Sequence, residues 1–248
     1  MNDETKNKRH LTTEEIRNGC VRVSGGENDE AQICMIQEEF RQGIDSIKSY
    51  DRAVTFYGSA VLPEASPIYQ RVRNIAYKVV KEFGVAVITG GGPGLMEAAN
   101  RGAFEAGGKS IGATIQLPRE QSTNKYVTDA IPFYFFFARK VTLSYTTEVC
   151  FYVPGGFGTL DELFEMLVLV QTGKIPPVPI ILIGSDFWRP LDTFIRESLL
   201  AKFDTVHPDD LKLYHILDDE EEIMQVIRDA KPRLGMGVWE DKKNILEK

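Results

Sequence analysis

The sequence predicts an α/β protein with a doubly wound, mainly parallel sheet that helices cover on both faces. Short apolar segments alternate with helical patterns through most of the 248 residues. The apolar segments lack the polar alternation of a half-exposed strand, which indicates strands buried on both faces. Glycine-rich loops follow two of these segments directly. Together these features are typical of a Rossmann-like fold, in which ligands bind at the carboxyl ends of the strands.

The elements follow one another in a regular order. The tail, 213–231, adds a short strand at LYHIL and an amphipathic helix that begins with the acidic run Asp218–Glu222, which the helix dipole favours. A polar loop is expected at 118–130. Strands are predicted at 53–58, 85–90, 110–117, 132–137, 149–153 and 179–184, and helices near 67–83, 94–106, 138–146, 159–173 and 187–202.

The N-terminal region is expected to differ from the rest. Residues 1–30 are rich in charge, glycine and asparagine without a sustained period, so we expect a flexible segment. In 31–50, isoleucine and phenylalanine recur at helical spacing and predict a peripheral helix. We therefore expect one Rossmann-like nucleotide-binding domain over 31–248.

Composition and charge exclude several classes of protein. The net charge of −7 argues against a general binder of nucleic acid or of membrane surfaces. The polar N-terminus lacks the apolar core of a signal peptide, and no apolar run approaches a membrane span. Cys20, Cys34 and Cys150 fit no disulfide framework and no zinc motif, and Cys150 is expected as a buried thiol. We expect a cytoplasmic protein without a metal or cofactor.

Two glycine loops share one design. Both 89-TGGGPGLMEAANRGAFEAGG-108 and 154-PGGFGTLDE-162 follow an apolar strand and open a helix. Glycines let an anion approach the backbone, and a helix N-terminus offers free N–H groups. The P-loop signature is absent, and a dinucleotide fingerprint is weak because Glu97 replaces its last glycine. The alternative is that both loops are only tight strand-to-helix turns.

Each loop is followed by a carboxylate. With Gly94 and Thr159 as helix N-caps, Glu97 and Glu162 both occupy the third helical position. One interpretation is a cap, because Thr159 and Glu162 match a capping box. The other is chemistry: a carboxylate there repels a bound phosphate, so at least one of the two should face the sugar end of a nucleotide. The helix dipole favours an ionised Glu162 at neutral pH, acting as an electrostatic stabiliser or general base.

A third candidate lies in 138-ARKV-141, after the aromatic run 133-FYFFF-137. Arg139 stands where a strand becomes a helix, at the same sheet edge, and its planar fork suits phosphate or ribose oxygens. A solvated arginine is the alternative. Lys140 is expected to face solvent. The aromatic run is expected in the core, although Phe137 can line a pocket.

These motifs together resemble the LOG (Lonely Guy) family of cytokinin-activating phosphoribohydrolases, many of which were once labelled lysine decarboxylases. The resemblance covers about residues 52–200. It implies a Rossmann-like fold, a homodimer or higher homo-oligomer, and hydrolysis of AMP or N6-modified AMP to the free base and ribose 5-phosphate. The family often reads M-H-E-R-K where this chain has Phe136-Phe137-Ala138-Arg139-Lys140, which leaves the preferred base open.

The resemblance also implies roles for individual residues. Glu162 becomes the catalytic carboxylate and Arg139 its partner. Glu97 has a less settled role and is grouped with the substrate-binding residues. The other expected substrate-binding residues are Gly155, Gly156, Gly158, Thr159, Gly91, Gly92, Gly94 and Ser59.

Three functional hypotheses remain at this point. A glycosidase fits the residues, because cleavage of an N-glycosidic bond develops positive charge that a carboxylate stabilises. A nucleotide-binding or sensing protein without turnover is the main alternative, and a structural oligomer is the third. A decarboxylase fits less well, because that chemistry normally uses pyridoxal phosphate and a lysine, and no lysine lies in either glycine loop.

Overall fold

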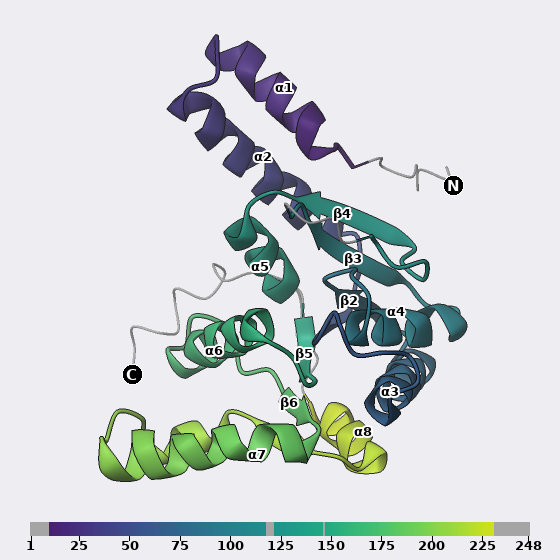
Figure 1. Cartoon of the computed structure of the whole chain (residues 1–248), viewed down its shortest axis with the longest axis vertical. Helices are drawn as coiled ribbons and strands as arrows, with labels where there is room; N and C mark the ends of the chain where they lie inside the picture. The colour runs from purple at the N-terminus through teal and green to yellow at the C-terminus, as the bar shows by residue number, and fades with distance from the viewer. Residues whose placement is uncertain (1–9, 118–121, 146, 231–248) are drawn as a thin grey trace.

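The computed structural model describes residues 10–117, 122–145 and 147–230, and in them seven parallel strands form one sheet (Figure 1). The strand order is β4-β3-β2-β1-β5-β6-β7, so the chain winds outward from β1 in one direction and then in the other. The predicted doubly wound fold is confirmed. The strands are β1 (Ala53–Tyr57), β2 (Ala86–Thr89), β3 (Ser110–Ile115), β4 (Asp129–Phe133), β5 (Thr147–Tyr152), β6 (Ile180–Ile183) and β7 (His215–Leu217).

Helices cover both faces of this sheet. One core joins the sheet to α3, α4 and α8, and a second joins its other face to α2, α5, α6 and α7. Alternate residues of β1 and β5 enter the two cores, which explains why these strands read as continuous apolar runs. The helices are α3 (Pro67–Phe83), α4 (Leu95–Glu105), α5 (Phe136–Tyr145), α6 (Phe157–Gln171), α7 (Ser185–Phe194) and α8 (Glu220–Asp229), with short helical segments η1 (Ile195–Lys202) and η2 (Pro208–Lys212).

The winding direction reverses between β1 and β5. Tyr57 and Tyr152 are paired in register, so both strands end at the same level. In open α/β sheets the crevice at such a reversal is the usual ligand site. Here it lies between the loop after β1 and the loop 154-PGGFG-158 after β5.

The region around β4 differs from the prediction. The strand is Asp129–Phe133, where 132–137 was expected, because α5 already begins at Phe136. Only Phe133 of the aromatic run is buried, whereas Tyr134, Phe136 and Phe137 are exposed. The prediction that this run belongs to the core was therefore wrong for these three residues.

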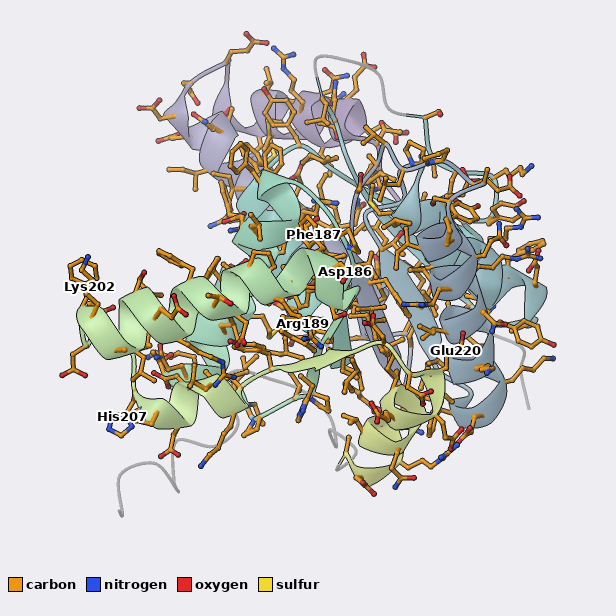
Figure 2. The ribbon with its side chains drawn as sticks, turned by 60° about the horizontal axis from the view of Figure 1, so that its bottom comes forward. Asp186, Phe187, Arg189, Lys202, His207 and Glu220 are labelled. Carbon is orange, nitrogen blue, oxygen red and sulfur yellow. A yellow bond between two sulfur atoms is a disulfide. The ribbon has the colours of Figure 1, made fainter. Side chains whose placement is uncertain are left out.

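The predicted helix at 187–202 is longer than expected. It comprises α7 and η1, a run of π-helix that reaches Lys202, far from Asp186 at the start of α7 (Figure 2). Trp188 holds its first turn against the sheet, since its indole N–H donates to the carbonyl of Ile183 at 3.2 Å. Asp218 binds the backbone N–H of Gly184 at 3.0 Å and so closes the start of the helix.

The N-terminal region forms a helical hairpin of α1 (Thr13–Ser24) and α2 (Asp29–Ile47), which projects from the sheet (Figure 1). The segment expected to be flexible thus contains a helix, which begins at a capping box between Thr12 and Glu15. Its signal was weak in the sequence because only Ile16 and Cys20 of α1 are buried. The predicted peripheral helix corresponds to α2.

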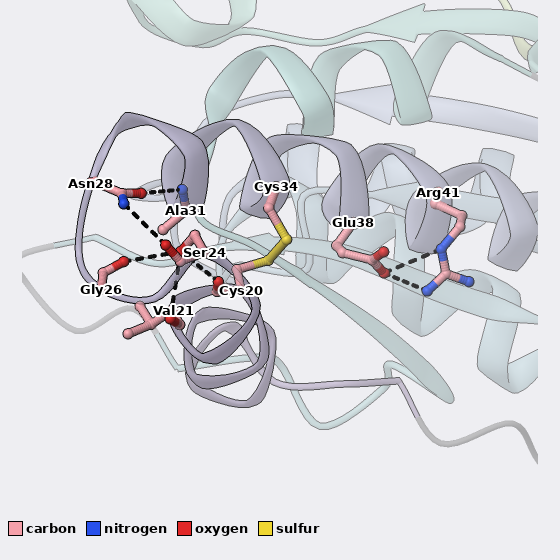
Figure 3. Close-up of a disulfide and its surroundings, with 9 residues drawn as sticks. All are labelled: Cys20, Val21, Ser24, Gly26, Asn28, Ala31, Cys34, Glu38 and Arg41. Carbon is pink, nitrogen blue, oxygen red and sulfur yellow. Dashed lines mark hydrogen bonds and ion pairs between the residues drawn. A yellow bond between two sulfur atoms is a disulfide. The ribbon is translucent and has the colours of Figure 1, made fainter.

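A disulfide links the two helices of the hairpin. Cys20 and Cys34 are bonded, with their Cα atoms 5.7 Å apart (Figure 3). The prediction that the cysteines form no disulfide was wrong, because a tight turn after α1 folds α2 back alongside it. Gly25 begins this turn at φ 76°, a conformation that glycine adopts without strain. Cys150 is a buried thiol, as expected.

Candidate functional site

The first glycine loop connects β2 to α4 and has little freedom. Gly91 and Gly94 adopt φ of 73° and 70°. A Cβ atom on Gly94 would lie 2.5 Å from the carbonyl oxygen of Ser59. The N–H of Leu95 donates to that same oxygen at 2.8 Å, and the N–H of Ser59 donates to the carbonyl of Pro154 at 3.0 Å. The Ser59 backbone therefore joins both glycine loops at the reversal point.

Buried polar side chains hold this loop from behind. The Asn124 side chain donates to the carbonyls of Gly91 and Gly92, at 3.1 and 3.0 Å, and to Asn100 at 2.9 Å. Asn100 in turn accepts a hydrogen bond from the Thr89 hydroxyl at 2.7 Å. Sequence reasoning missed this network, because an asparagine in a polar loop gives no sign that it will be buried.

The second glycine loop leaves the start of α6 open. Gly156 is the N-cap, no side chain caps this end, and Gly156, Phe157 and Gly158 are exposed. Thr159 is buried because its side chain packs against Gly155, where a Cβ atom would lie 2.2 Å from the Thr159 hydroxyl. The N–H groups of a first helical turn have no partner within the helix, and such a helix start can bind an anion.

The predicted capping box is not formed. Because α6 begins at Phe157, Thr159 is its third residue and Glu162 its sixth, one turn further along than expected. A glycine N-cap allows this earlier start. Glu162 is thus free of any cap role. Glu97 does lie at the predicted third position of α4, after its N-cap Gly94.

The structure brings Glu162 and Arg139 together. The Arg139 Nη1 atom lies 3.4 Å from the Glu162 Oε1 atom, and both side chains are nearly buried. The Arg139 Nε–H also donates to the carbonyl of Ala113 at 2.7 Å. A Cβ atom on Gly90 would lie 2.3 Å from the Arg139 Nη2 atom. Arg139 therefore fits between the first glycine loop and α6, and Gly90 is a site residue that sequence reasoning missed.

Burial sets the protonation of Glu162. Loss of solvent raises the pKa of the Glu162 carboxyl to about 7, while the Arg139 charge opposes that rise. The prediction that Glu162 is simply ionised at neutral pH was therefore wrong. The helix dipole acts mainly within the first turn, and Glu162 lies beyond it. Near pH 7 both forms of the carboxyl are populated.

Two neighbours of this pair also differ from expectation. Lys140 was expected to face solvent, but its ammonium lies 3.1 Å from Asp161 and 3.3 Å from Glu165 on α6. Behind the pair, the rings of Tyr57 and Tyr152 stack at 4.7 Å, and the Tyr152 hydroxyl donates to the Glu162 carbonyl at 3.0 Å. Ion pairs and this hydroxyl thus fix α6 against α5 and the sheet.

Glu97 belongs to a separate cluster on the other face of the sheet. Its carboxylate accepts a hydrogen bond from the Tyr69 hydroxyl of α3 at 3.0 Å. No direct contact joins Glu97 to Arg139 or Glu162 in the part of the chain that the structure describes. The two carboxylates that looked equivalent in sequence are therefore not equivalent in space.

Residues 10–117, 122–145 and 147–230 contain no group of three or more histidine, cysteine or acidic residues placed to hold a metal ion. None of their helices combines the length and the apolar character of a membrane span.

The fold and the site define a Rossmann-like α/β protein with paired glycine loops and an arginine–carboxylate pair at the carboxyl edge of its sheet. The model of a family described as "Possible lysine decarboxylase" matches residues 96–227. The chain belongs to this family, which is the LOG family that the sequence motifs indicated.

Curated relatives carry phosphoribohydrolase names. LOG5 of Arabidopsis thaliana, a cytokinin riboside 5′-monophosphate phosphoribohydrolase, is 28% identical and the match covers 69% of this chain and 77% of LOG5. The rice (Oryza sativa subsp. japonica) enzyme LOG, of the same name, is 27% identical over 77% of this chain and 79% of its own length. The rice protein LOGL3, a probable enzyme of this kind, is 26% identical, with 68% and 83% covered.

Solved structures share the fold. The structural genomics target TM1055 is similar with a TM-score of 0.52 and 24% identity, over 71% of this chain and 98% of its own. A molybdenum cofactor binding protein from Rippkaea orientalis is similar with a TM-score of 0.50 and 23% identity, over 71% and 93%. At this identity the similarity concerns the fold alone.

Proposed function

We propose that the protein hydrolyses the N-glycosidic bond of adenosine 5′-monophosphate or an N6-modified AMP, releasing the base and ribose 5-phosphate. The observation that carries this proposal is the nearly buried Arg139–Glu162 pair, placed beside an uncapped helix N-terminus. The names of the curated relatives agree with it.

The 5′-phosphate would bind at the start of α6. Gly156, Phe157 and Gly158 are exposed there, no side chain caps this helix end, and the Thr159 hydroxyl makes no hydrogen bond within the described residues. Glu162 follows five residues after Phe157, so it stands about 7–8 Å along the helix axis. One helix can therefore hold the phosphate at its end and present a carboxylate to the sugar.

The chemistry follows from the position and pKa of Glu162. The C1′–N9 bond breaks with its electron pair passing to the base, and the sugar becomes oxocarbenium-like. An ionised Glu162 stabilises that charge and accepts a proton from the water whose oxygen bonds to C1′. The departing base takes up a proton from solvent and Glu162 returns the proton it accepted, so the net reaction adds one water across the C1′–N9 bond. A pKa of about 7 suits a general base that works near neutrality.

Arg139 would keep this carboxylate ionised and in position. Its positive charge opposes the rise in the pKa of Glu162, and its bonds to Glu162 and to the Ala113 carbonyl fix the geometry. The first glycine loop, with Gly91, Gly92 and Gly94, would line the opposite side of the bound nucleotide together with Ser59 and Glu97.

The alternative is a protein that binds nucleotides without turnover. Assay of free base from a panel of nucleoside 5′-monophosphates distinguishes the two. The proposal expects base release from AMP or an N6-substituted AMP by the wild type, and its loss in Glu162→Gln. Glu197→Gln on the exposed side of η1 is the matched control and should keep full activity. Tight nucleotide binding with no release by the wild type would establish the alternative.

A homodimer is a second part of the proposal. Phe164 and Val168 are exposed one turn apart on α6, and Phe136 and Phe137 are exposed at the start of α5. Apolar surface gathered on two neighbouring helices suits burial against a second copy of the chain. Light scattering should give twice the chain mass for the wild type, and the mass of one chain for Val168→Glu.

A further inference from the structure

A carboxylate of the N-terminal hairpin is completely buried against the start of α5. Glu39 on α2 is 0% exposed, and its two oxygens accept hydrogen bonds from the N–H groups of Tyr134 at 2.8 Å and Phe135 at 3.0 Å. These N–H groups immediately precede α5, which begins at Phe136. Glu39 therefore caps this helix from a different element, 95 residues earlier in the chain.

Within the residues that the structure describes, Glu39 has no cationic partner. The N–H groups of Tyr134 and Phe135 are therefore what stabilises its buried carboxylate. Burial raises the pKa of Glu39, and the N–H groups of Phe135 and Tyr134 oppose that rise. A buried carboxylate is costly unless its oxygens are satisfied. The contact with the positive end of the α5 dipole meets that need, so α2 and α5 are bound to a fixed relative position.

A second contact fixes the same two helices. One turn after Glu39, a Cβ atom on Gly43 would lie 2.3 Å from the Thr142 hydroxyl oxygen and 2.9 Å from the Phe133 ring. The backbone of α2 at Gly43 therefore packs directly against the Thr142 side chain of α5 and the Phe133 ring of β4, and the lower end of α2 lies beside α5 and β4 in Figure 1. The rings of Phe40 and Phe137 also meet, at 6.0 Å.

The fixed helix is the one that carries Arg139. The N–H of Arg139 donates to the Phe135 carbonyl at 3.2 Å, so Arg139 closes the turn whose first N–H groups Glu39 holds. The bond from Arg139 to Glu162 is 3.4 Å long, close to the limit of a hydrogen bond. A small rotation or shift of α5 would break it.

We propose that Glu39 is a positioning residue: by capping α5 it holds Arg139 within reach of Glu162. The N-terminal hairpin then serves the site, although it lies outside the sheet and its loops. Its effect on turnover rests on the proposed function, but its effect on the Arg139–Glu162 pair does not.

The test measures the pKa of the Glu162 carboxyl by NMR titration of protein labelled with ¹³C at the glutamate carboxyls. Glu162→Gln identifies the signal. Charged or titratable groups around Glu162 are Arg139 and Lys140 of α5, Asp161 and Glu165 of α6, and Tyr57 and Tyr152 of the sheet. When the α5 cap is removed, the interactions of Arg139 and Lys140 with Glu162 should weaken, because both residues lie on α5; both lower the pKa of Glu162, so the pKa should rise.

The variants are Glu39→Ala and the isosteric Glu39→Gln. Because Arg139 lowers the pKa of Glu162, Glu39→Ala should raise that pKa by about 1 unit. Glu39→Gln should shift it less, since the amide oxygen still accepts one N–H. The control is Glu38→Gln, which removes the partly exposed partner of Arg41 (Figure 3) and should leave the pKa unchanged.

Activity gives an independent measure. Glu39→Gln should lower kcat by roughly 10- to 100-fold with little change in KM, as expected when a catalytic pair is misplaced. An unchanged pKa of Glu162 in folded Glu39→Gln, or an equal shift in Glu38→Gln, would overturn the proposal. If the wild type releases no base, the proposed function fails, while the titration still decides the role of Glu39.

Discussion

The two glycine loops look alike in sequence but are built in different ways. In the first, Gly91 and Gly94 have positive φ, and a Cβ atom on Gly94 would overlap the Ser59 carbonyl. In the second, no glycine has positive φ, and a Cβ atom on Gly156 or Gly158 would meet nothing within 4 Å. The fold itself requires glycine in the first loop. At two positions of the second loop it does not.

This difference between the loops indicates which of them would bind a ligand. A glycine that the fold does not require still exposes its backbone N–H and lets an anion approach closely. The carboxylates differ in the same way: Glu97 is held by Tyr69, whereas burial raises the pKa of Glu162 to about 7 beside Arg139. We infer that the first loop is mainly a support and that the second binds and reacts.

The largest expected effect separates the two carboxylates. Glu162→Gln should lower kcat by about 10²- to 10⁴-fold, the usual contribution of a general base. Glu97→Gln keeps an acceptor for Tyr69 and loses at most one charge-assisted bond, so kcat/KM should fall by no more than about tenfold. Steady-state assays of base release measure both. Equal losses in the two variants would contradict the division of roles.

The next effect concerns the fold. Gly94→Ala places a side chain at φ 70° and against the Ser59 carbonyl. The backbone conformation costs about 1–2 kcal/mol and the overlap about 1–3 kcal/mol more, so the free energy of unfolding should fall by about 2–5 kcal/mol. Urea unfolding followed by circular dichroism measures it. A change below 1 kcal/mol would mean that the first loop is not the constrained one.

A third effect tests the buried carboxyl through pH. The folded-state pKa of Glu162 is about 7 and the ordinary pKa of a glutamate is 4.5, so the folded protein binds this proton more tightly than the unfolded chain. The wild type therefore loses stability as pH rises from 4.5 to 7, by about 3 kcal/mol in all. The Glu162→Gln variant has no titrating carboxyl at this position, so its free energy of unfolding should not fall in this way as pH rises.

Unfolding of both proteins at pH 4.5, 6, 7 and 8 measures this difference. The two should be equally stable at pH 4.5, and Glu162→Gln should be the more stable by about 3 kcal/mol at pH 8. On the activity side, kcat/KM should rise with pH through about 7 if the ionised carboxylate is the active form. A stability difference that does not vary with pH would show that Glu162 titrates normally.

The sequence predicted the sheet and both loops, because these depend on local patterns, whereas the pairing of Arg139 with Glu162 was implied by the resemblance to the LOG family. Apolar runs indicate buried strands, and parallel strands bring their carboxyl ends to one edge. The Cys20–Cys34 disulfide, the burial of Glu39 and the Asn124 network were not predicted. Each depends on which distant segments come into contact, and a single sequence carries no local signal for that.

The error about Glu162 has the same origin. The sequence places it after a threonine in a capping pattern, and the predicted pKa followed from that local setting. The helix in fact begins at Phe157, and the pKa depends on desolvation by packing around α6. The local pattern drew attention to Glu162, but its ionisation depends on the three-dimensional surroundings.

The smallest expected effect is that of Gly158→Ala, a substitution within the second glycine loop, on stability and KM. Gly158 is the second residue of α6, is exposed and has open space where a Cβ atom would stand. Alanine there should stabilise the fold by about 0.4–1 kcal/mol, since it restricts the unfolded chain and favours helix. It should also crowd the N–H groups that would hold a phosphate, and so raise KM.

Gly173→Ala and Gly107→Ala make poor controls because both glycines have positive φ, whereas Gly19 lies inside α1 with open space around it. Gly19→Ala should therefore stabilise the fold by a similar amount and leave KM unchanged. Thermal unfolding and base-release kinetics on the two variants separate fold from ligand. If Gly158→Ala is more stable than the wild type and has the wild-type KM, its added Cβ atom meets no ligand. That result would show that the phosphate does not bind at this end of α6.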